Sequence, residues 1–170
     1  LGKDLVQLGG VYENGAVASP LSEHFVCLDC HNIQPESKFA DDNDPASRLE
    51  FAKANNLPYL PGSTLYGITN RTSWFNGDHV KKYGKELIDP ARHDLKNAIQ
   101  LCSKECSVGR ELTDEEMDAT MHYLTSMELK MKDLNLSDEE FAGISANGQT
   151  EDEKADNIKL IKSKYLDGYP

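Results

Sequence analysis

Two cysteines, Cys27 and Cys30, stand three positions apart in the chain, and His31 follows the second directly. On a helical turn, residues at i and i+3 share one face, so both thiols would reach the two vinyl groups along one edge of a porphyrin. His31 would then lie under the macrocycle, where its imidazole is able to bind the iron axially. This is the attachment pattern of a covalent haem, and a chain that carries it has to fold around a large, flat cofactor.

Two further interpretations use the same cysteines. A disulfide between Cys27 and Cys30 is typical of a strand followed by a helix, which the surrounding sequence does not predict. A zinc site would combine this pair with Cys102 and Cys106, because two closely spaced thiol pairs are typical of tetrahedral thiolate sites. Zinc would leave His31 without a role. We therefore expect one covalent haem c, with a structural zinc-binding domain as the alternative.

The charge of the chain limits its partners. Its 170 residues carry a formal charge of −11, and the pI is near 4.8. Nucleic acids and anionic membranes favour clustered lysine and arginine, so neither is expected as a partner. A protein with a basic docking surface would suit the chain better. No apolar run approaches the roughly 18 to 20 residues that a membrane-spanning helix needs.

Apolar periodicity and capping residues predict a mostly helical chain with long loops. A first helix within residues 2–12 should break at Gly9 and Gly10, and a short helix is expected over residues 47–54. An amphipathic helix should begin at Asp89, with Pro90 in its first turn, and end near Gly109. Three more helices are expected: two that begin with capping boxes, at residues 113 and 137, and a last one over residues 151–166.

Aromatic and aliphatic residues between positions 59 and 75 stand in segments with little regular pattern of their own. A flat cofactor organises such loops, because large rings bury well against it. We therefore expect them to line a haem pocket. The residues nominated for its wall are Tyr59, Leu65, Trp74 and Phe75, with Leu60 and Tyr66 beside them in the sequence.

Four stretches carry a family resemblance: GKDLVQL, FVCLDCHN, PGSTLYGITNR and AIQLCSKECSVGRELTDEEMDATMHYLTSM. Together they resemble the c-type cytochrome domains of the thiosulfate dehydrogenase and Sox-type group. The resemblance implies an all-α, cytochrome c-like fold, in which an N-terminal helix crosses a C-terminal helix and long loops surround one covalent haem. Residues 1–131 would form this monohaem domain, and residues 132–170 an acidic extension with an extra C-terminal helix. In such proteins the haem is attached outside the bacterial cytoplasm, so the resemblance implies that this protein lies in the periplasm or on the outer face of a membrane.

The resemblance also implies a ligand on the second side of the iron. In the sulfur-oxidising group the cysteine that matches Cys102 is an axial ligand, so His31 and Cys102 are the implied pair, and a thiolate lowers the potential relative to methionine. A disulfide between Cys102 and Cys106 stays open, since exported proteins form such bonds, and it would remove both sulfurs as ligands. The remaining candidates for the sixth position would then be Met117, Met121, His79 and His93.

Two functions are compatible with this pattern. An electron-transfer cytochrome would exchange electrons with a redox partner chosen by surface charge. A haem enzyme that oxidises an inorganic sulfur compound is the alternative, and Arg71, otherwise a residue at the edge of the pocket, would then hold the anion as an arginine does in that group. Those enzymes generally carry a second haem, whereas the pair Cys102 and Cys106 has no histidine after it. We therefore favour electron transfer; assembly into a larger respiratory complex stays open.

Overall fold

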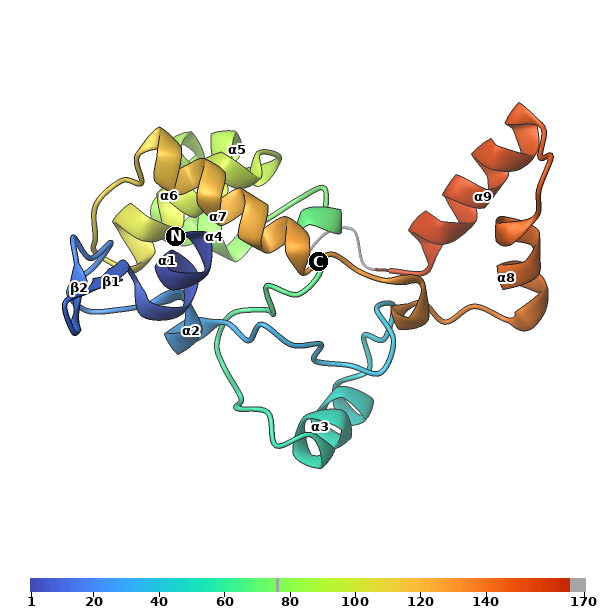
Figure 1. The fold of residues 1–170 in the computed structure, drawn as a ribbon, viewed down its shortest axis with the longest axis horizontal. Coiled ribbons are helices and arrows are strands. Elements are labelled where there is room, and N and C mark those ends of the chain that lie inside the picture. Colours follow the sequence, from blue (N-terminus) through green and yellow to red (C-terminus); the bar gives the residue numbers. More distant parts are fainter. Residues whose placement is uncertain (76, 166–170) are drawn as a thin grey trace. The chain divides into compact units, whose positions relative to one another are not determined.

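The structure is a computed structural model that describes residues 1–75 and 77–165. It is mostly helical, with one two-stranded antiparallel sheet, so the expected all-α class is confirmed at that level (Figure 1). The chain divides into two compact units. Unit 1 comprises residues 1–34 and 59–128, and unit 2 comprises Pro35–Pro58 and the described residues from Leu129 onward. Unit 2 therefore takes in a segment from the first half of the chain, Pro35–Pro58, which the expected boundary after residue 131 assigned to the first domain.

Unit 1 contains most of the helices. In chain order its elements are α1 (Gly2–Leu8), β1 (Val11–Glu13), β2 (Ala16–Ala18), α2 (Cys27–Cys30), the 3₁₀ turn η1 (Ile68–Asn70), α4 (Gly77–Tyr83), α5 (Lys85–Arg92), α6 (Leu95–Leu101), the π-helical turn η2 (Cys102–Cys106) and α7 (Asp114–Ser126).

Helices α1 and α7, at opposite ends of unit 1 in sequence, pack directly against each other (Figure 1). Gly2 lies so close to α7 that a Cβ atom there would overlap the carbonyl of Ala119. Further along the crossing, Gln7 Nε2 donates to the Tyr123 hydroxyl at 2.7 Å. Helix α1 ends where expected, because Gly9 adopts a left-handed conformation with φ of 76°. The N-terminal helix therefore closes onto the last helix of the unit.

Three groups of buried side chains form the core of unit 1. One joins α1 to α7 through Leu5 and Met117, and a second joins α5 to α6. The third is centred on Val6, Ile68 and Leu124. Partly buried residues connect the groups, since Ile99 packs against the first and third, and Trp74 and Leu95 pack against the second and third. The core is therefore continuous from α1 to α6.

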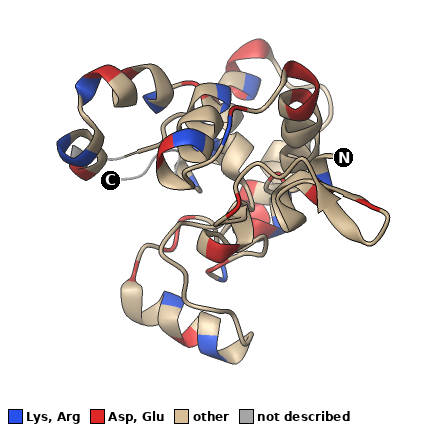
Figure 2. Ribbon diagram, turned by 90° about the vertical axis from the view of Figure 1, so that its left-hand side faces the viewer, with Lys and Arg blue, Asp and Glu red and all other residues tan. Residues whose placement is uncertain are grey.

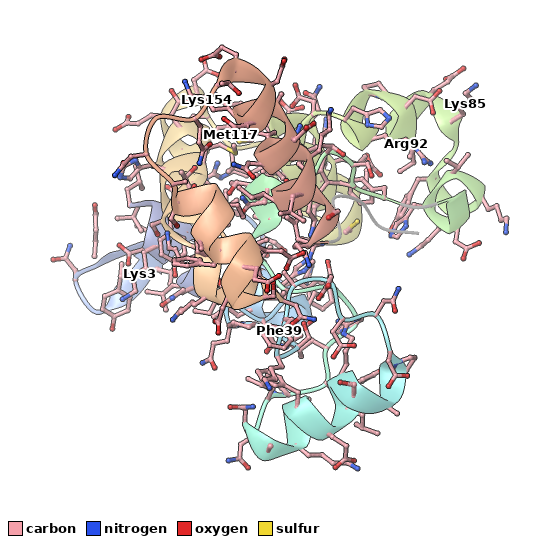
Figure 3. The ribbon with its side chains drawn as sticks, turned by 90° about the vertical axis from the view of Figure 1, so that its right-hand side faces the viewer. Lys3, Phe39, Lys85, Arg92, Met117 and Lys154 are labelled. Atoms are coloured by element: carbon pink, nitrogen blue, oxygen red, sulfur yellow. The ribbon has the colours of Figure 1, made fainter. Side chains whose placement is uncertain are left out.

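The prediction of a single helix from Asp89 to Gly109 is wrong. Pro90 lies inside α5, whose ends are Lys85 and Arg92, labelled in Figure 3. A new helix then begins after Asp94, whose carboxylate caps it by accepting from the Asn97 backbone N–H at 2.9 Å. The β1–β2 hairpin was also not expected from the sequence; its strands are only three residues long and carry almost no apolar alternation.

The expected start of α7 is confirmed. Thr113 and Glu116 form a reciprocal capping box, and Glu116 also accepts two hydrogen bonds from Arg110 at 2.8 and 2.6 Å. Arg110 donates in addition to the carbonyls of Ser19 and Pro20 at 2.8 and 3.2 Å. This guanidinium therefore connects the loop before α2 to the first turn of α7, and together with the backbone bond within the cap it lowers the pKa of Glu116 to about 2.

We predict a pH-dependent contribution from this pair. Because the pKa of Glu116 is depressed in the fold from an ordinary 4.5, its stabilisation is present above pH 4.5 and is lost as the pH falls through about 2. Arg110 is 36% exposed, which screens the pair, so we expect about 1 to 2 kcal/mol. Chemical unfolding of wild type and Arg110→Met between pH 5 and 2 measures the contribution of the pair to the free energy of unfolding. Only wild type should lose this contribution as the pH falls. Lys104→Met, which removes an exposed partner of Glu111, should change little; a wild-type slope retained in Arg110→Met would contradict the assignment.

Unit 2 has little core of its own. Its elements are α3 (Pro45–Ala54), the 3₁₀ turn η3 (Met131–Asp133), α8 (Asp138–Ser145) and α9 (Glu151–Ser163). The predicted capping box at Ser137 is formed, and a second box, which was not predicted, is formed at Thr150. None of the three α-helices has a buried side chain. Lys164 pairs with Glu140 at 2.8 Å, which ties the end of α9 to α8. The expected last helix was to end at Leu166, which lies outside the described residues.

Acidic and basic side chains are interleaved along the helices rather than segregated (Figure 2). On α9, for example, Lys154 pairs with Glu151 at 2.6 Å and Lys159 with Asp156 at 2.9 Å. Within the described parts of the chain, no helix combines the length and the apolar character needed to cross a bilayer.

Candidate functional site

The two cysteines of the attachment pattern lie on one helical turn, as predicted. Helix α2 consists of Cys27–Cys30, and the His31 backbone N–H donates to the Cys27 carbonyl at 2.9 Å. Asp29 stabilises the start of the turn, because its carboxylate accepts from the Val26 backbone N–H at 2.8 Å. Cys27 faces the third core group, and this burial raises the pKa of its thiol to about 11. The first thiol of the pattern is therefore directed into the interior of unit 1.

His31 is held by a loop that is distant in sequence. Its Nδ1 lies 2.6 Å from the Ser63 backbone carbonyl. A carbonyl oxygen only accepts, so Nδ1 is the donor, and in the neutral ring Nε2 carries the lone pair. Gly62 packs against the same imidazole: a Cβ there would overlap Cε1 and Nδ1 of His31, and the Gly62 N–H donates to the Cys30 carbonyl at 2.8 Å. Residues 62 and 63 thus fix the orientation of the ring.

The loop that holds His31 is itself anchored. Thr64 Oγ1 donates to the carbonyls of Asn32 and Gln34, at 3.1 and 2.7 Å, immediately after the histidine. Arg71 donates from Nη1 to Ser63 Oγ at 2.8 Å. The predicted pocket-edge arginine is therefore part of the support of the histidine, acting through Ser63.

The residues predicted to line a pocket separate into two groups. Leu65 and Trp74 pack in the same core group as Cys27, and Phe75 packs in the neighbouring group that also contains Trp74. Tyr59 is 92% exposed, so the structure does not bring it into this wall.

Two buried polar atoms near these residues lack a hydrogen-bond partner among the residues that the structure describes. They are the indole Nε1 of Trp74 and the hydroxyl Oγ1 of Thr69. A buried donor without a partner costs about 1 to 3 kcal/mol, so native structures rarely leave one unpaired without a functional reason. Both side chains come from residues 59–75, the segment predicted to line a haem pocket. These are therefore donors that a polar group of a bound molecule would satisfy.

A second sulfur-containing site lies at η2. All four cysteines are free thiols; Cys102 begins η2 and is partly buried, and Cys106 ends it and is exposed. The neighbouring Cys102 thiol and Tyr83 hydroxyl, with the charge of Lys82, lower the pKa of Cys106 to about 6, while the neighbouring Cys106 and burial raise the pKa of Cys102. Cys27 lies close enough to Cys102 for its charge to raise that pKa further. Nothing in the sequence marks Lys82 and Tyr83 as members of this site, because they belong to a different helix.

The other candidates for the sixth iron position have contacts of their own. Met117 is buried between Leu5 and Leu112, and Met121 packs against the same group. His79 lies between the rings of Phe75 and Tyr83, and His93 Nδ1 is 3.0 Å from the Thr72 carbonyl.

The four-cysteine zinc site finds no support in the geometry. Across residues 1–75 and 77–165, no three His, Cys, Asp or Glu side chains are arranged so that they would hold a metal ion. That range includes all four cysteines.

Comparison of the chain with protein-family models, with curated proteins and with solved structures finds no match in any of the three.

Proposed function

We propose that this chain is an electron-transfer c-type cytochrome with one covalently attached haem and a cytochrome c-like unit 1. The observation that supports it best is the combination of Cys27 and Cys30 on one helical turn with an imidazole that a distant carbonyl orients through Nδ1. A metal-binding histidine almost always donates its second ring N–H to such an acceptor, because this fixes the tautomer and the ring orientation. Only glycine at position 62 lets the loop approach the ring this closely, because any Cβ would overlap the imidazole.

The residues present fit a haem in their chemistry. The two thiols would hold a haem covalently, and His31 Nε2 would bind its iron. A haem also carries two carboxylates, and the N–H of Trp74 and the hydroxyl of Thr69, which lack partners among the described residues, are donors for such groups on the neighbouring segment. When bound, the haem supplies a one-electron couple of iron. The protein's part is to orient the ligands and to exclude water from the buried side.

For the sixth position we favour Cys102. Its thiol is partly buried and lies close enough to Cys27 for the charge of one to raise the pKa of the other. The buried methionines Met117 and Met121 are more simply explained as core residues, since they stand at helical spacing and pack on α1.

The partner and the location follow from the same proposal. A net charge of −11 favours a redox partner with a basic docking surface. Covalent haem attachment places the protein in the periplasm or on the outer face of a bacterial membrane. Oxidation of a sulfur compound is the second candidate, but Arg71 donates to Ser63 and supports His31, so no observation favours its use as an anion-binding residue.

Expression of the full chain with a haem-attachment system tests the proposal. We expect the intact mass to exceed that of the polypeptide by one haem and the visible spectrum to be that of a six-coordinate c-type cytochrome. The variant Cys27→Ser/Cys30→Ser should carry no covalent haem, whereas Cys106→Ser should carry the full amount. A wild-type chain that matures without added mass would refute the proposal.

A further inference from the structure

The chain contains two acceptor patterns for N-linked glycosylation, in which asparagine is followed by any residue except proline and then by serine or threonine. One consists of Asn70 and Thr72, and the other of Asn135 and Ser137. A glycan is bulky and strongly hydrated, so its acceptor has to lie at the protein surface. The structure places the two asparagines in different environments.

Asn70 belongs to the packed part of unit 1. It ends the turn η1, whose first residue, Ile68, is buried and packs in a core group with Val6 and Leu124. The Asn70 residue is itself half-buried, and its backbone N–H donates to the Gly67 carbonyl at 3.0 Å. Transfer of a glycan to this asparagine would therefore require η1 to leave the core.

Asn135 lies in the exposed connection between η3 and α8 (Figure 1). The Leu136 N–H donates to the Leu134 carbonyl at 2.9 Å, which closes a three-residue turn with Asn135 at its centre. Leu134 is buried and anchors the turn. The Asn135 side chain is exposed, and its amide has no hydrogen-bond partner among the residues that the structure describes. The turn thus presents this amide to solvent.

Burial alternates along the same turn. Leu134 and Leu136 are the more buried positions, whereas Asn135 and Ser137 are exposed. An enzyme that recognises an asparagine together with the hydroxyl two positions later would therefore find both groups accessible. Ser137 Oγ accepts from the Glu140 backbone N–H at 3.1 Å in the cap of α8. A hydroxyl also donates, so its O–H is still able to bond to an enzyme.

The residue two positions before each asparagine also differs. Bacterial enzymes that transfer oligosaccharides to asparagine select a carboxylate there. Asp133 stands at this position before Asn135, whereas the buried Ile68 stands before Asn70. The Asp133 carboxylate accepts from the Lys130 backbone N–H at 2.7 Å, so the short turn η3 has to open when such an enzyme binds.

We propose that Asn135 is a site of N-linked glycosylation, with a lipid diphosphate-linked oligosaccharide as the donor and an oligosaccharyl transferase as the catalyst. The Asn135 Nδ2 atom attacks C1 of the first sugar, and an N-glycosidic bond forms. The bond between C1 and the diphosphate oxygen breaks, and the lipid diphosphate leaves with its electron pair. One amide proton passes to a base of the transferase. The inference depends on the proposed location outside the cytoplasm, where such donors are used, and not on the haem.

Export of the full chain from cells that carry a bacterial oligosaccharyl transferase, its lipid-linked donor and a haem-attachment system tests the inference. Trypsin places the two acceptors in different peptides, residues 54–71 and residues 133–154. We expect the second peptide to gain the mass of one oligosaccharide and the first to gain none. The visible spectrum of the same sample reports the haem separately.

Variants separate the acceptor pattern from the stability of α8. Asn135→Gln should remove the glycan. Ser137→Thr should keep it, since it keeps both the hydroxyl and the cap, whereas Ser137→Asp should lose the glycan and keep the helix, because a carboxylate also caps a helix. Asn147→Gln is the matched control: Asn147 is an exposed asparagine of the same peptide with no hydroxyl residue two positions later. That variant should remain glycosylated.

Four results decide the inference. An unmodified 133–154 peptide, in cells that glycosylate a known acceptor protein, overturns it whatever the haem spectrum shows. Equal glycosylation of Asn70 shows that the exposed turn does not select the site, and it overturns the structural argument. A glycan that persists in Ser137→Asp overturns the assigned recognition of the hydroxyl. A glycan on Asn135 in a chain that carries no haem supports the inference and refutes the proposed cytochrome function.

Discussion

The variant Gly62→Ala is expected to lose most of the six-coordinate, low-spin spectrum that the proposed haem would give the wild-type chain. A Cβ at this position would overlap two atoms of the His31 ring and lie 2.8 Å from the Cys30 carbonyl. Neither neighbour has room to move, because the carbonyl accepts from the Gly62 N–H and the ring is bound to Ser63. The loop must withdraw, and the bond from Nδ1 to Ser63 O is lost with it. Loss of such a support typically costs 10 to 100-fold in metal affinity.

The measurement is the visible spectrum of oxidised and reduced protein, together with the fraction of chains that carry haem. Ser63→Ala is the matched control, because it keeps the carbonyl that orients His31 and removes only the hydroxyl that accepts from Arg71. It should retain the low-spin spectrum. If Gly62→Ala and wild type gave the same spectrum, the loop would not be what positions the histidine.

Gly2→Val is expected to cause the largest loss of stability in unit 1. Helix α1 approaches α7 so closely at Gly2 that any Cβ would overlap the Ala119 carbonyl, and it would lie 3.1 Å from the Thr120 backbone nitrogen. A carbonyl within a helix cannot rotate away, so the two helices must separate and disturb the packing of Leu5 on Met117. Overpacking of this kind costs about 1 to 3 kcal/mol, and we expect the upper end of that range.

Denaturant unfolding of the full chain, followed through the single tryptophan, Trp74, reports on unit 1. Gly143→Ala serves as the control, since α8 leaves open space around that position. Removing a helical glycine there should stabilise α8 by up to about 1 kcal/mol and leave the transition of unit 1 unchanged. Equal unfolding midpoints for Gly2→Val and wild type would show that the crossing tolerates a side chain.

Some of the structure could be predicted from local sequence because its causes are local. The turn of Cys27 to Cys30, the end of α1 at Gly9 and the capping boxes each depend on residues within four positions of one another. The split between α5 and α6 was missed although it is also local. The sequence prediction placed Pro90 in the first turn of a long helix. In the structure Pro90 lies inside α5, and Asp94 caps the start of the next helix, α6.

The sequence by itself determined the mostly helical class and the net charge of −11, and it predicted Cys27, Cys30 and His31 as the donor set. Only the tertiary structure decided that Ser63 orients His31, that Tyr83 and Lys82 stand beside Cys106, and that Tyr59 faces solvent. The physical reason is the same in each case. These contacts join segments tens of residues apart, and their energies depend on how the helices pack, which no spacing along the chain encodes.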